Sequence, residues 1–149
     1  MRHLLAVVLA LVIVIAVGVA NIALMWFTLG WKFAFSGEGP EASLGWCAGM
    51  LVGGAVGSLL GGFCCRKLSA DKSAAPVWAL IALAVLLALQ GLAVRKNVSD
   101  STLPEGKTVG ELTFLEASEY AVSPRWFHVA NLLVGPGFIW CGSRLGRRR

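Results

Sequence analysis

The sequence predicts an all-α integral membrane protein, a four-helix bundle with short connections and one longer outer loop. Of its 149 residues, 57% are hydrophobic and 14% are charged, whereas soluble domains carry roughly 25% charged residues. Four apolar stretches without charge make up most of the chain, and basic residues stand at their ends. Residues 1–149 are therefore predicted to form a single membrane domain, with no room for a separate globular domain.

The apolar stretches are of the length that a membrane span requires. A helix needs about 20 mostly apolar residues to cross the hydrocarbon core. We predict spans over about 4–29, 44–65, 75–94 and 125–143. The last is at the short end of the range. Ser43, directly before the second span, is of the residue type that caps helix N-termini.

The beginning of the chain has a second interpretation. Arg2, the apolar run 4–17 and the small residues Gly18 and Ala20 imitate a signal peptide that is cleaved after about residue 20. The apolar run continues to Trp31, however, so cleavage would leave half a span at the new terminus. An uncleaved first span is the simpler interpretation.

The basic residues are distributed unevenly between the two sides of a four-span protein. Eight lie on the side of the two termini, and five lie on the other side together with seven acidic residues. Because cytoplasmic segments carry an excess of Lys and Arg, both termini are predicted to be cytoplasmic. This distribution also accounts for the net charge of +5 without a nucleic-acid partner.

The longest connection, residues 95–124, is predicted to lie on the outer side. Thr108 and Glu111 have the spacing of a capping box, in which each side chain caps a backbone N–H at a helix start. Apolar and acidic residues are mixed after them. A short interfacial helix over 109–121 is one interpretation, and an irregular acidic loop is the other.

The second span contains a row of glycines spaced four residues apart, the pattern of a glycine zipper. The row consists of Gly45, Gly49, Gly53, Gly57 and Gly61. A second, offset row consists of Gly54, Ser58 and Gly62. Small residues let helices approach closely in lipid. The row is predicted to pack this helix against its own neighbours, with a second copy or another membrane protein as the alternative.

Four polar side chains are predicted to lie in the outer half of the spans, namely Asn21, Gln90, His128 and Asn131. Polar groups inside membranes are expensive and frequently functional. They could together form an outward-facing polar vestibule for a ligand or ion. The simpler interpretation is hydrogen bonding between helices.

The sequence lacks the residues that several kinds of chemistry require. The spans contain no carboxylate or Lys, which disfavours proton-coupled transport. His3 and His128 lie at opposite faces of the membrane, so they cannot share a haem. Cys47 stands alone on the outer side, and no C-x-x-C pair is present. We expect no catalytic residues, no metal and no cofactor.

Four short spans, a glycine-rich second helix and an arginine-rich end are similar to small bacterial membrane proteins, which implies the bacterial inner (cytoplasmic) membrane. The sequence predicts a non-enzymatic structural or accessory subunit that assembles through its glycine-zipper helix. Its predicted partners are the lipid bilayer and either a second copy or another membrane protein. A small permease or channel with an outward-facing polar vestibule is the alternative.

Overall fold

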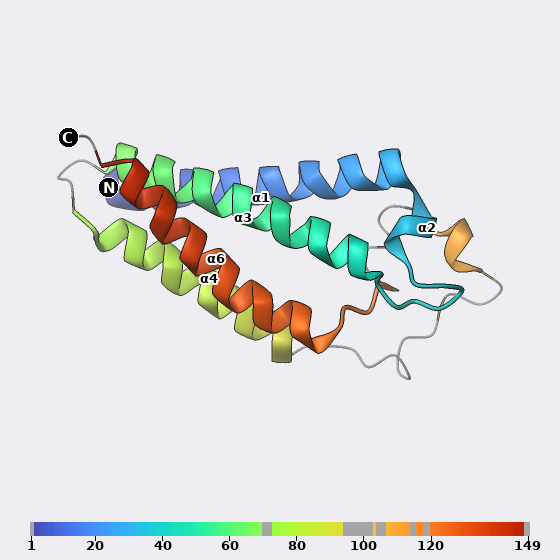
Figure 1. Cartoon of the computed structure of the whole chain (residues 1–149). Helices are drawn as coiled ribbons and strands as arrows, with labels where there is room; N and C mark the ends of the chain where they lie inside the picture. Colours follow the sequence, from blue (N-terminus) through green and yellow to red (C-terminus); the bar gives the residue numbers. More distant parts are fainter. Residues whose placement is uncertain are drawn as a thin grey trace.

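The computed structural model describes residues 2–69, 73–93, 103, 107–113, 116–117 and 120–147. The named elements in this part of the chain are all helical, which confirms the predicted all-α class (Figure 1). The four main helices are α1 (Arg2–Leu29), α3 (Leu44–Leu68), α4 (Ala75–Ala93) and α6 (Arg125–Leu145), and the short ones are α2 (Trp31–Ala34) and the 3-10 helix η2 (Val109–Glu111).

Three of the main helices, α1, α3 and α4, are long and apolar enough to cross a membrane. The fourth main helix, α6, is 21 residues long, but its mean hydropathy is too low for it to count as a candidate span. Its sequence includes His128, Asn131 and Pro136, which are polar or weakly apolar. The structure therefore supports three candidate spans, and the fourth stays a prediction.

The helices end close to the predicted positions, with two extensions. α3 continues to Leu68 and α6 to Leu145, beyond the predicted ends at 65 and 143. Basic side chains occupy both last turns, Arg66 and Lys67 in α3 and Arg144 in α6. Positive charge is favourable beside the carbonyl end of a helix, so these turns stay helical after the apolar run has ended.

The connection from α1 to α3 contains a break at Gly30 and a cap at Ser43. Gly30 has φ of +73°, a backbone conformation that glycine adopts without steric cost. The Ser43 hydroxyl oxygen accepts a hydrogen bond from the Trp46 N–H at 3.0 Å, which confirms the predicted N-cap of α3. The same hydroxyl donates to the Phe33 carbonyl in α2. Ser43 thus ties the start of α3 to the preceding short helix.

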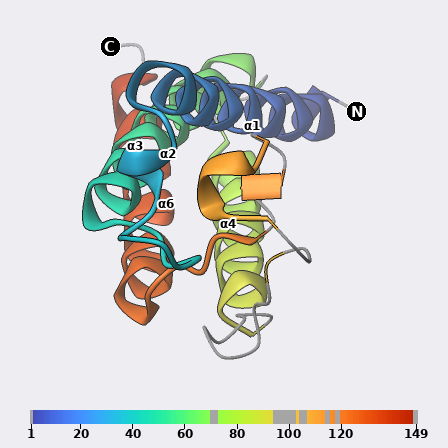
Figure 2. The same ribbon diagram turned by 90° about the vertical axis from the view of Figure 1, so that its right-hand side faces the viewer.

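The four main helices form a bundle in which α3 lies between α1 and α6, and α4 packs against α6. The chain direction alternates from one helix to the next. One end of the bundle, here called the termini end, carries the start of α1, the end of α3, the start of α4 and the end of α6. The opposite loop end carries α2 and η2 (Figure 1). Figure 2 views the bundle from the loop end, with α3 and α6 on one side, α4 on the other and α1 crossing above them.

At the termini end all four main helices contribute to one apolar core. Its buried residues are Ala6, Ala10, Cys65, Val77, Leu80 and Ile139. The two alanines on α1 leave room for the larger side chains of α4 and α6. This core accounts for the position of α4, whose buried positions all lie in its first two turns.

The outer surface of the bundle is also apolar, which is unusual for a protein that faces water. Phe27 is 79% exposed, Leu4 70% and Leu133 70%. Monomeric soluble proteins rarely expose contiguous apolar patches larger than a few hundred Å². An apolar exterior around a bundle of this length fits a lipid environment.

The loop end is covered by a second apolar cluster, here called the loop-end cap. Its buried residues are Ala34, Phe35, Val109, Leu112 and Ala117. Two isolated β-bridges, Phe35 with Ala42 and Glu41 with Val122, connect chain segments at this end. The bridge at Val122 includes hydrogen bonds from the Ala42 N–H to the Val122 carbonyl at 3.0 Å and from the Val122 N–H to the Pro40 carbonyl at 2.8 Å. The segment before α6 is thereby attached to the α2–α3 connection.

The predicted capping box is present, but the helix after it is shorter than predicted. The Thr108 N–H donates to Glu111 Oε2 at 2.9 Å, and the Thr108 hydroxyl donates to the same oxygen at 3.1 Å. η2 then ends at Glu111, and Leu112 is extended with φ of −71° and ψ of 135°. Leu112 is 5% exposed because it joins the loop-end cap. Its burial favours an extended backbone over a continuous helix from 109 to 121.

A second cap follows at Thr113. Its hydroxyl accepts from the Glu116 N–H at 3.4 Å, and the Glu116 side chain accepts from the Thr113 N–H at 2.9 Å. Glu116 and Ala117 are helical, while residues 114, 115, 118 and 119 lie outside the described part of the chain. The extended Leu112 thus separates η2 from the helical residues Glu116, Ala117 and Tyr120, so the described residues do not form one continuous helix over 109–121.

The Glu116 carboxyl group is expected to titrate far below its usual range. Lys107 Nζ lies 2.6 Å from Glu116 Oε1, and the Thr113 N–H and hydroxyl both donate to Oε2 at 2.9 Å. These interactions, with that of Lys107 largest, favour the charged carboxylate and lower its pKa to about 2. Because the folded pKa is depressed, the stabilisation is present above the ordinary pKa near 4.5 and is lost as the pH falls toward about 2.

This prediction can be measured by a carboxyl-carbon NMR titration of the protein in detergent. The midpoint for Glu116 should lie near 2 in the native chain and should rise in Lys107→Gln. Lys32→Gln, which removes a charge elsewhere at the loop end, is the matched control and should leave it unchanged. An ordinary midpoint in the native chain would contradict the ion pair.

Candidate functional site

The glycines predicted to pack helices lie along the face of α3 that contacts α1 and α2. A Cβ added to Gly57 would lie 3.2 Å from the Val14 carbonyl oxygen, and one added to Gly61 would lie 3.2 Å from the Ala10 carbonyl oxygen. These two glycines therefore face the backbone of α1 directly. At either position an added Cβ would therefore require the α1 backbone to shift by a few tenths of an ångström.

The other three glycines of this row face side chains instead of backbone. A Cβ on Gly45 would lie 2.8 Å from the Phe33 ring, and one on Gly49 would lie 2.7 Å from the Met25 sulfur. A Cβ on Gly53 would overlap the Asn21 side chain. Flexible side chains can move where backbone cannot, so the backbone of α1 limits residue size only at Gly57 and Gly61, toward the termini end of the row.

The offset row of small residues faces α6. A Cβ on Gly62 would overlap the Ile139 carbonyl and would lie 2.9 Å from its Cα. A Cβ on Gly142 would likewise overlap the Leu59 carbonyl. Further along, a Cβ on Gly54 would lie 3.9 Å from Asn131 Oδ1, and one on Gly135 would lie 3.9 Å from Ser58 Oγ. α6 thus runs alongside α3 in the same direction, in contact over most of its length.

Gly142 is a packing residue that the sequence-based prediction does not include. It lies seven residues after Gly135, a spacing of two turns that places both on one face of a helix. This spacing is the signal that could have identified it. It is weaker than the row in α3 because only two glycines carry it and Pro136 lies between them.

The two small-residue rows of α3 are therefore both covered by helices of the same chain. Adjacent positions on a helix diverge by about 100°, so Gly53 and Gly54 face different neighbours. α3 is the most enclosed of the four main helices, with seven buried residues against four in α6 and three each in α1 and α4.

Asn21 makes one hydrogen bond across the α1–α3 interface and one within α1. Its Nδ2 donates to the Gly49 carbonyl at 3.2 Å and lies 3.4 Å from the Met25 sulfur. The Gly49 carbonyl belongs to α3, so this contact joins two helices inside an apolar environment. Hydrogen bonds of this kind between membrane helices contribute about 1 kcal/mol each.

The other three residues of the predicted vestibule lie elsewhere. Asn131 on α6 faces Gly54 of α3, and His128 on α6 lies beside Gly91 of α4. Gln90 on α4 is exposed. Asn21 lies on a different side of α3 from Asn131. The structure therefore does not bring the four residues to one space: Asn21 and Asn131 lie at different interfaces of α3, His128 lies beside Gly91 of α4, and Gln90 is exposed.

A cavity of about 190 Å³ does lie at the loop end, but other residues form it. Its lining is Ile22, Trp26, Ala34, Phe35, Trp46, Met50, Ala117, Ala121 and Ser123. Trp26 and Trp46 meet edge to face in its wall, with ring centroids 6.3 Å apart. The wall is mainly aromatic and aliphatic, which suits an apolar occupant better than an ion.

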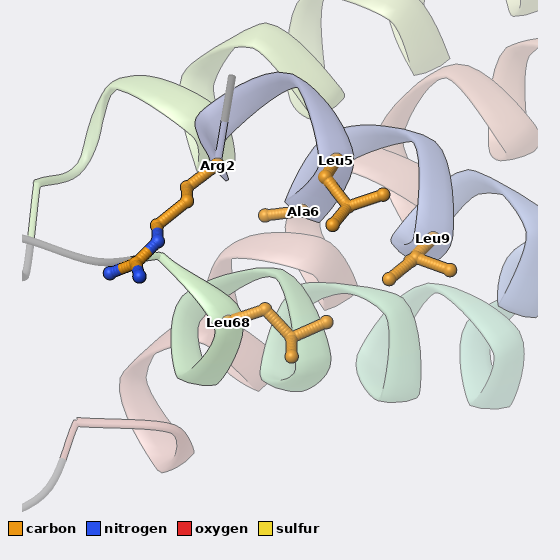
Figure 3. A pocket seen from close by; sticks show the side chains of 5 residues that line it. All are labelled: Arg2, Leu5, Ala6, Leu9 and Leu68. Atoms are coloured by element: carbon orange, nitrogen blue, oxygen red, sulfur yellow. The ribbon is translucent and has the colours of Figure 1, made fainter.

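A second cavity, of about 280 Å³, lies between the start of α1 and the end of α3. Figure 3 shows Leu5 and Leu9 of α1 extending toward Leu68 of α3, with the Arg2 guanidinium lying away from them. Ala6 completes the lining. The wall of this cavity is apolar except for the Arg2 side chain at its edge.

The four cysteines are free thiols. Cys47 and Cys65 are buried, Cys64 is half-buried and Cys141 is exposed. In the described part of the chain, no three His, Cys, Asp or Glu side chains come close enough together to hold a metal ion.

No protein-family model matches the chain. The comparisons with curated proteins and with solved structures give no match either. A function for this small helical protein with three candidate membrane spans must therefore come from the contacts and charges of its own residues.

Proposed function

We propose that this chain is a four-span integral membrane protein with a structural or accessory role rather than an enzymatic one. The observation that carries the proposal is the placement of α6 along α3, which is itself a candidate span. Contacts between the two helices extend from Gly54 and Asn131 to Gly62 and Ile139. A helix that follows α3 this closely enters the membrane with it.

The exposed face of α6 supports a fourth span despite its lower hydropathy. Trp126, Val129, Leu133 and Trp140 are exposed on it, with Leu133 at 70%. Its polar residue Asn131 faces α3 instead. The average hydropathy of the helix therefore understates how apolar its lipid-facing side is, since a neighbouring helix covers the polar side.

The proposed orientation places both termini in the cytoplasm, with the bacterial inner membrane as the location. The described acidic residues, Glu38, Glu41, Glu111 and Glu116, all belong to segments at the loop end. Basic residues gather at the termini end, as expected for a cytoplasmic face. The alternation of the helices puts both termini at that same end.

This orientation predicts that tags at both termini share one side of the membrane. In spheroplasts of a bacterial expression host, neither terminal tag should react with an impermeant reagent until the membrane is permeabilised. A tag inserted at Gly39, in the α2–α3 connection, should react without permeabilisation and serves as the control. Termini on opposite faces would contradict the four-span topology, and loss of the N-terminal tag alone would indicate cleavage of the first span.

The packing of α3 bears on how the protein associates with others. Because both of its small-residue rows face the chain's own helices, the glycine zipper is proposed to assemble the bundle itself. An accessory role would then use the exposed apolar faces of α1 and α4. If Gly53→Leu combined with Gly57→Leu turned a native oligomer into a folded monomer, the row would instead hold a second copy.

A small permease or channel draws less support from the structure. Its predicted vestibule needs Asn21 and Asn131 to face one space, whereas α3 lies between them. Solute flux in proteoliposomes that is abolished by His128→Ala or Asn131→Ala would favour the permease over the structural role.

A further inference from the structure

A cavity of about 160 Å³ at the termini end gathers three arginines from separate parts of the chain. Arg66 comes from the last turn of α3, Arg144 from the last turn of α6 and Arg147 from the residues that follow α6. The remaining lining residues are Ala74, Val77, Trp78, Trp140 and Ser143. We call this space the basic cavity.

Two of the three guanidinium groups are held in place by defined contacts. Arg66 Nη1 donates to the Ser73 carbonyl at 2.6 Å, which links α3 to the start of α4. The Arg144 guanidinium stacks on the Trp140 ring, 4.3 Å from its centroid. An arginine carries five N–H donors, so Arg66 keeps donors for a ligand beyond this bond.

The charge of the basic cavity is not balanced by acidic residues in the described part of the chain. None of its lining residues is Asp or Glu. The described glutamates lie at the loop end, on the other side of the bundle. Three positive charges around one space favour an anionic occupant.

The surroundings of the cavity indicate what kind of anion fits. Trp78 is 60% exposed and Trp140 is 43% exposed, and both line the cavity. Exposed tryptophans at the ends of membrane helices lie at the level of the lipid headgroups. Val77 adds a buried apolar wall beside them. The site therefore offers cations for a phosphate together with apolar and aromatic surface for the rest of a lipid.

We propose that the basic cavity binds the phosphate of an anionic phospholipid at the cytoplasmic face of the membrane. Arg144 in the last turn of α6, Arg147 just after that helix and Arg66 on α3 would hold the phosphate oxygens, because guanidinium groups match phosphate geometry. A bound lipid would join the ends of α3 and α6. The inference rests on the proposed insertion of the chain in a membrane.

The test uses the full chain in nanodiscs that contain equal amounts of phosphatidylglycerol and phosphatidylcholine, followed by native mass spectrometry of the released protein with its retained lipids. The variant is Arg144→Gln with Arg147→Gln. Arg66 is left intact because its bond to Ser73 also supports the α3–α4 connection. Two controls remove one charge each outside the cavity: Arg2→Gln at the termini end and Arg125→Gln at the loop end.

The native chain should retain phosphatidylglycerol in preference to phosphatidylcholine. Each arginine near an anionic headgroup contributes roughly a fivefold preference, so the double variant should lower the preference by about 25-fold. Arg2→Gln and Arg125→Gln should leave it within about twofold, because neither arginine lines the basic cavity and the attraction to a headgroup held there falls off with distance. An equal loss in Arg2→Gln would show general attraction to a charged surface and would overturn the site, as would an unchanged preference in the double variant.

Two further outcomes distinguish a lipid site from a site for free phosphate and from a failure of membrane insertion. If millimolar inorganic phosphate displaced the retained lipid, the cavity would be a site for free phosphate and the lipid proposal would be wrong. If the native chain did not enter nanodiscs at all, the proposed membrane insertion would fail, whereas normal insertion without lipid preference would overturn the basic cavity alone.

Discussion

Replacing Gly142 or Gly62 by alanine is expected to destabilise the protein more than any other single methyl group added to the bundle. At both positions the new Cβ would overlap the backbone carbonyl of the facing helix, Leu59 in one case and Ile139 in the other. Backbone cannot rotate away as a side chain can. The two helices must therefore separate, and the contacts around the crossing are weakened together.

The expected loss is about 3 kcal/mol for each variant, at the upper end of the usual cost of overpacking. The measurement is unfolding in mixed detergent micelles, followed by tryptophan fluorescence and far-UV circular dichroism. Gly62→Ala with Gly142→Ala should give little folded protein, because both substitutions affect the same crossing and their effects do not simply add.

The matched control is Gly54→Ala, on the same face of α3. A Cβ there would meet only Asn131 Oδ1 at 3.9 Å, an ordinary contact distance. Gly18→Ala, with nothing within 4 Å, is a second control in α1. Both should be neutral, or slightly stabilising because alanine favours helix over glycine. If Gly62→Ala unfolded at the same mole fraction of denaturing detergent in the mixed micelles as these controls, α3 and α6 would not cross as closely as described.

The second large effect is expected at Gly53, and it should depend on Asn21. Gly53→Ala places a methyl group where the Asn21 side chain lies. The asparagine must then move, which breaks its 3.2 Å hydrogen bond to the Gly49 carbonyl. Overpacking and the lost bond together should cost about 2 kcal/mol.

A double-mutant cycle distinguishes the contact between Gly53 and Asn21 from a general intolerance of α3 to substitution. Asn21→Ala alone should cost about 1 kcal/mol for the lost interhelical bond. In that background Gly53→Ala should cost much less than in the native chain, because the obstructing side chain is gone. Strictly additive costs would contradict a direct contact between the two residues. The same unfolding assay serves, with Gly54→Ala as the control in both backgrounds.

These variants also bear on the role of Asn21. If its function is to join α1 and α3, Asn21→Ala should change stability only. A change in solute flux at unchanged stability would instead return Asn21 to the predicted vestibule.

Local features of this protein were predictable because they depend on neighbouring residues. The N-cap at Ser43 and the capping box of Thr108 and Glu111 need only the right residue types at the right spacing. Leu112 shows the limit of this reasoning. Its burial in the loop-end cap depends on α2, which is distant in sequence, and that contact ends the helical turn early.

The candidate site was less predictable, since it depends on which helices are neighbours. Depth along a helix can be counted from sequence, and this count is the basis for grouping Asn21, Gln90 and Asn131 in one half of the spans. The direction in which each side chain points around its helix depends on pairwise packing. Gln90 is exposed on α4, while Asn21 and Asn131 lie against different sides of α3.

The sequence alone determined that this protein is helical, where its main helices lie and which ends of them are basic. Those properties follow from apolar length, local capping and charge, which each segment carries by itself. Tertiary structure decided that one glycine row meets α1 and the other α6, that Gly142 completes the crossing, and that Arg66 joins Arg144 around one cavity. Helix partners are chosen by how two surfaces fit, and a single segment does not contain that information.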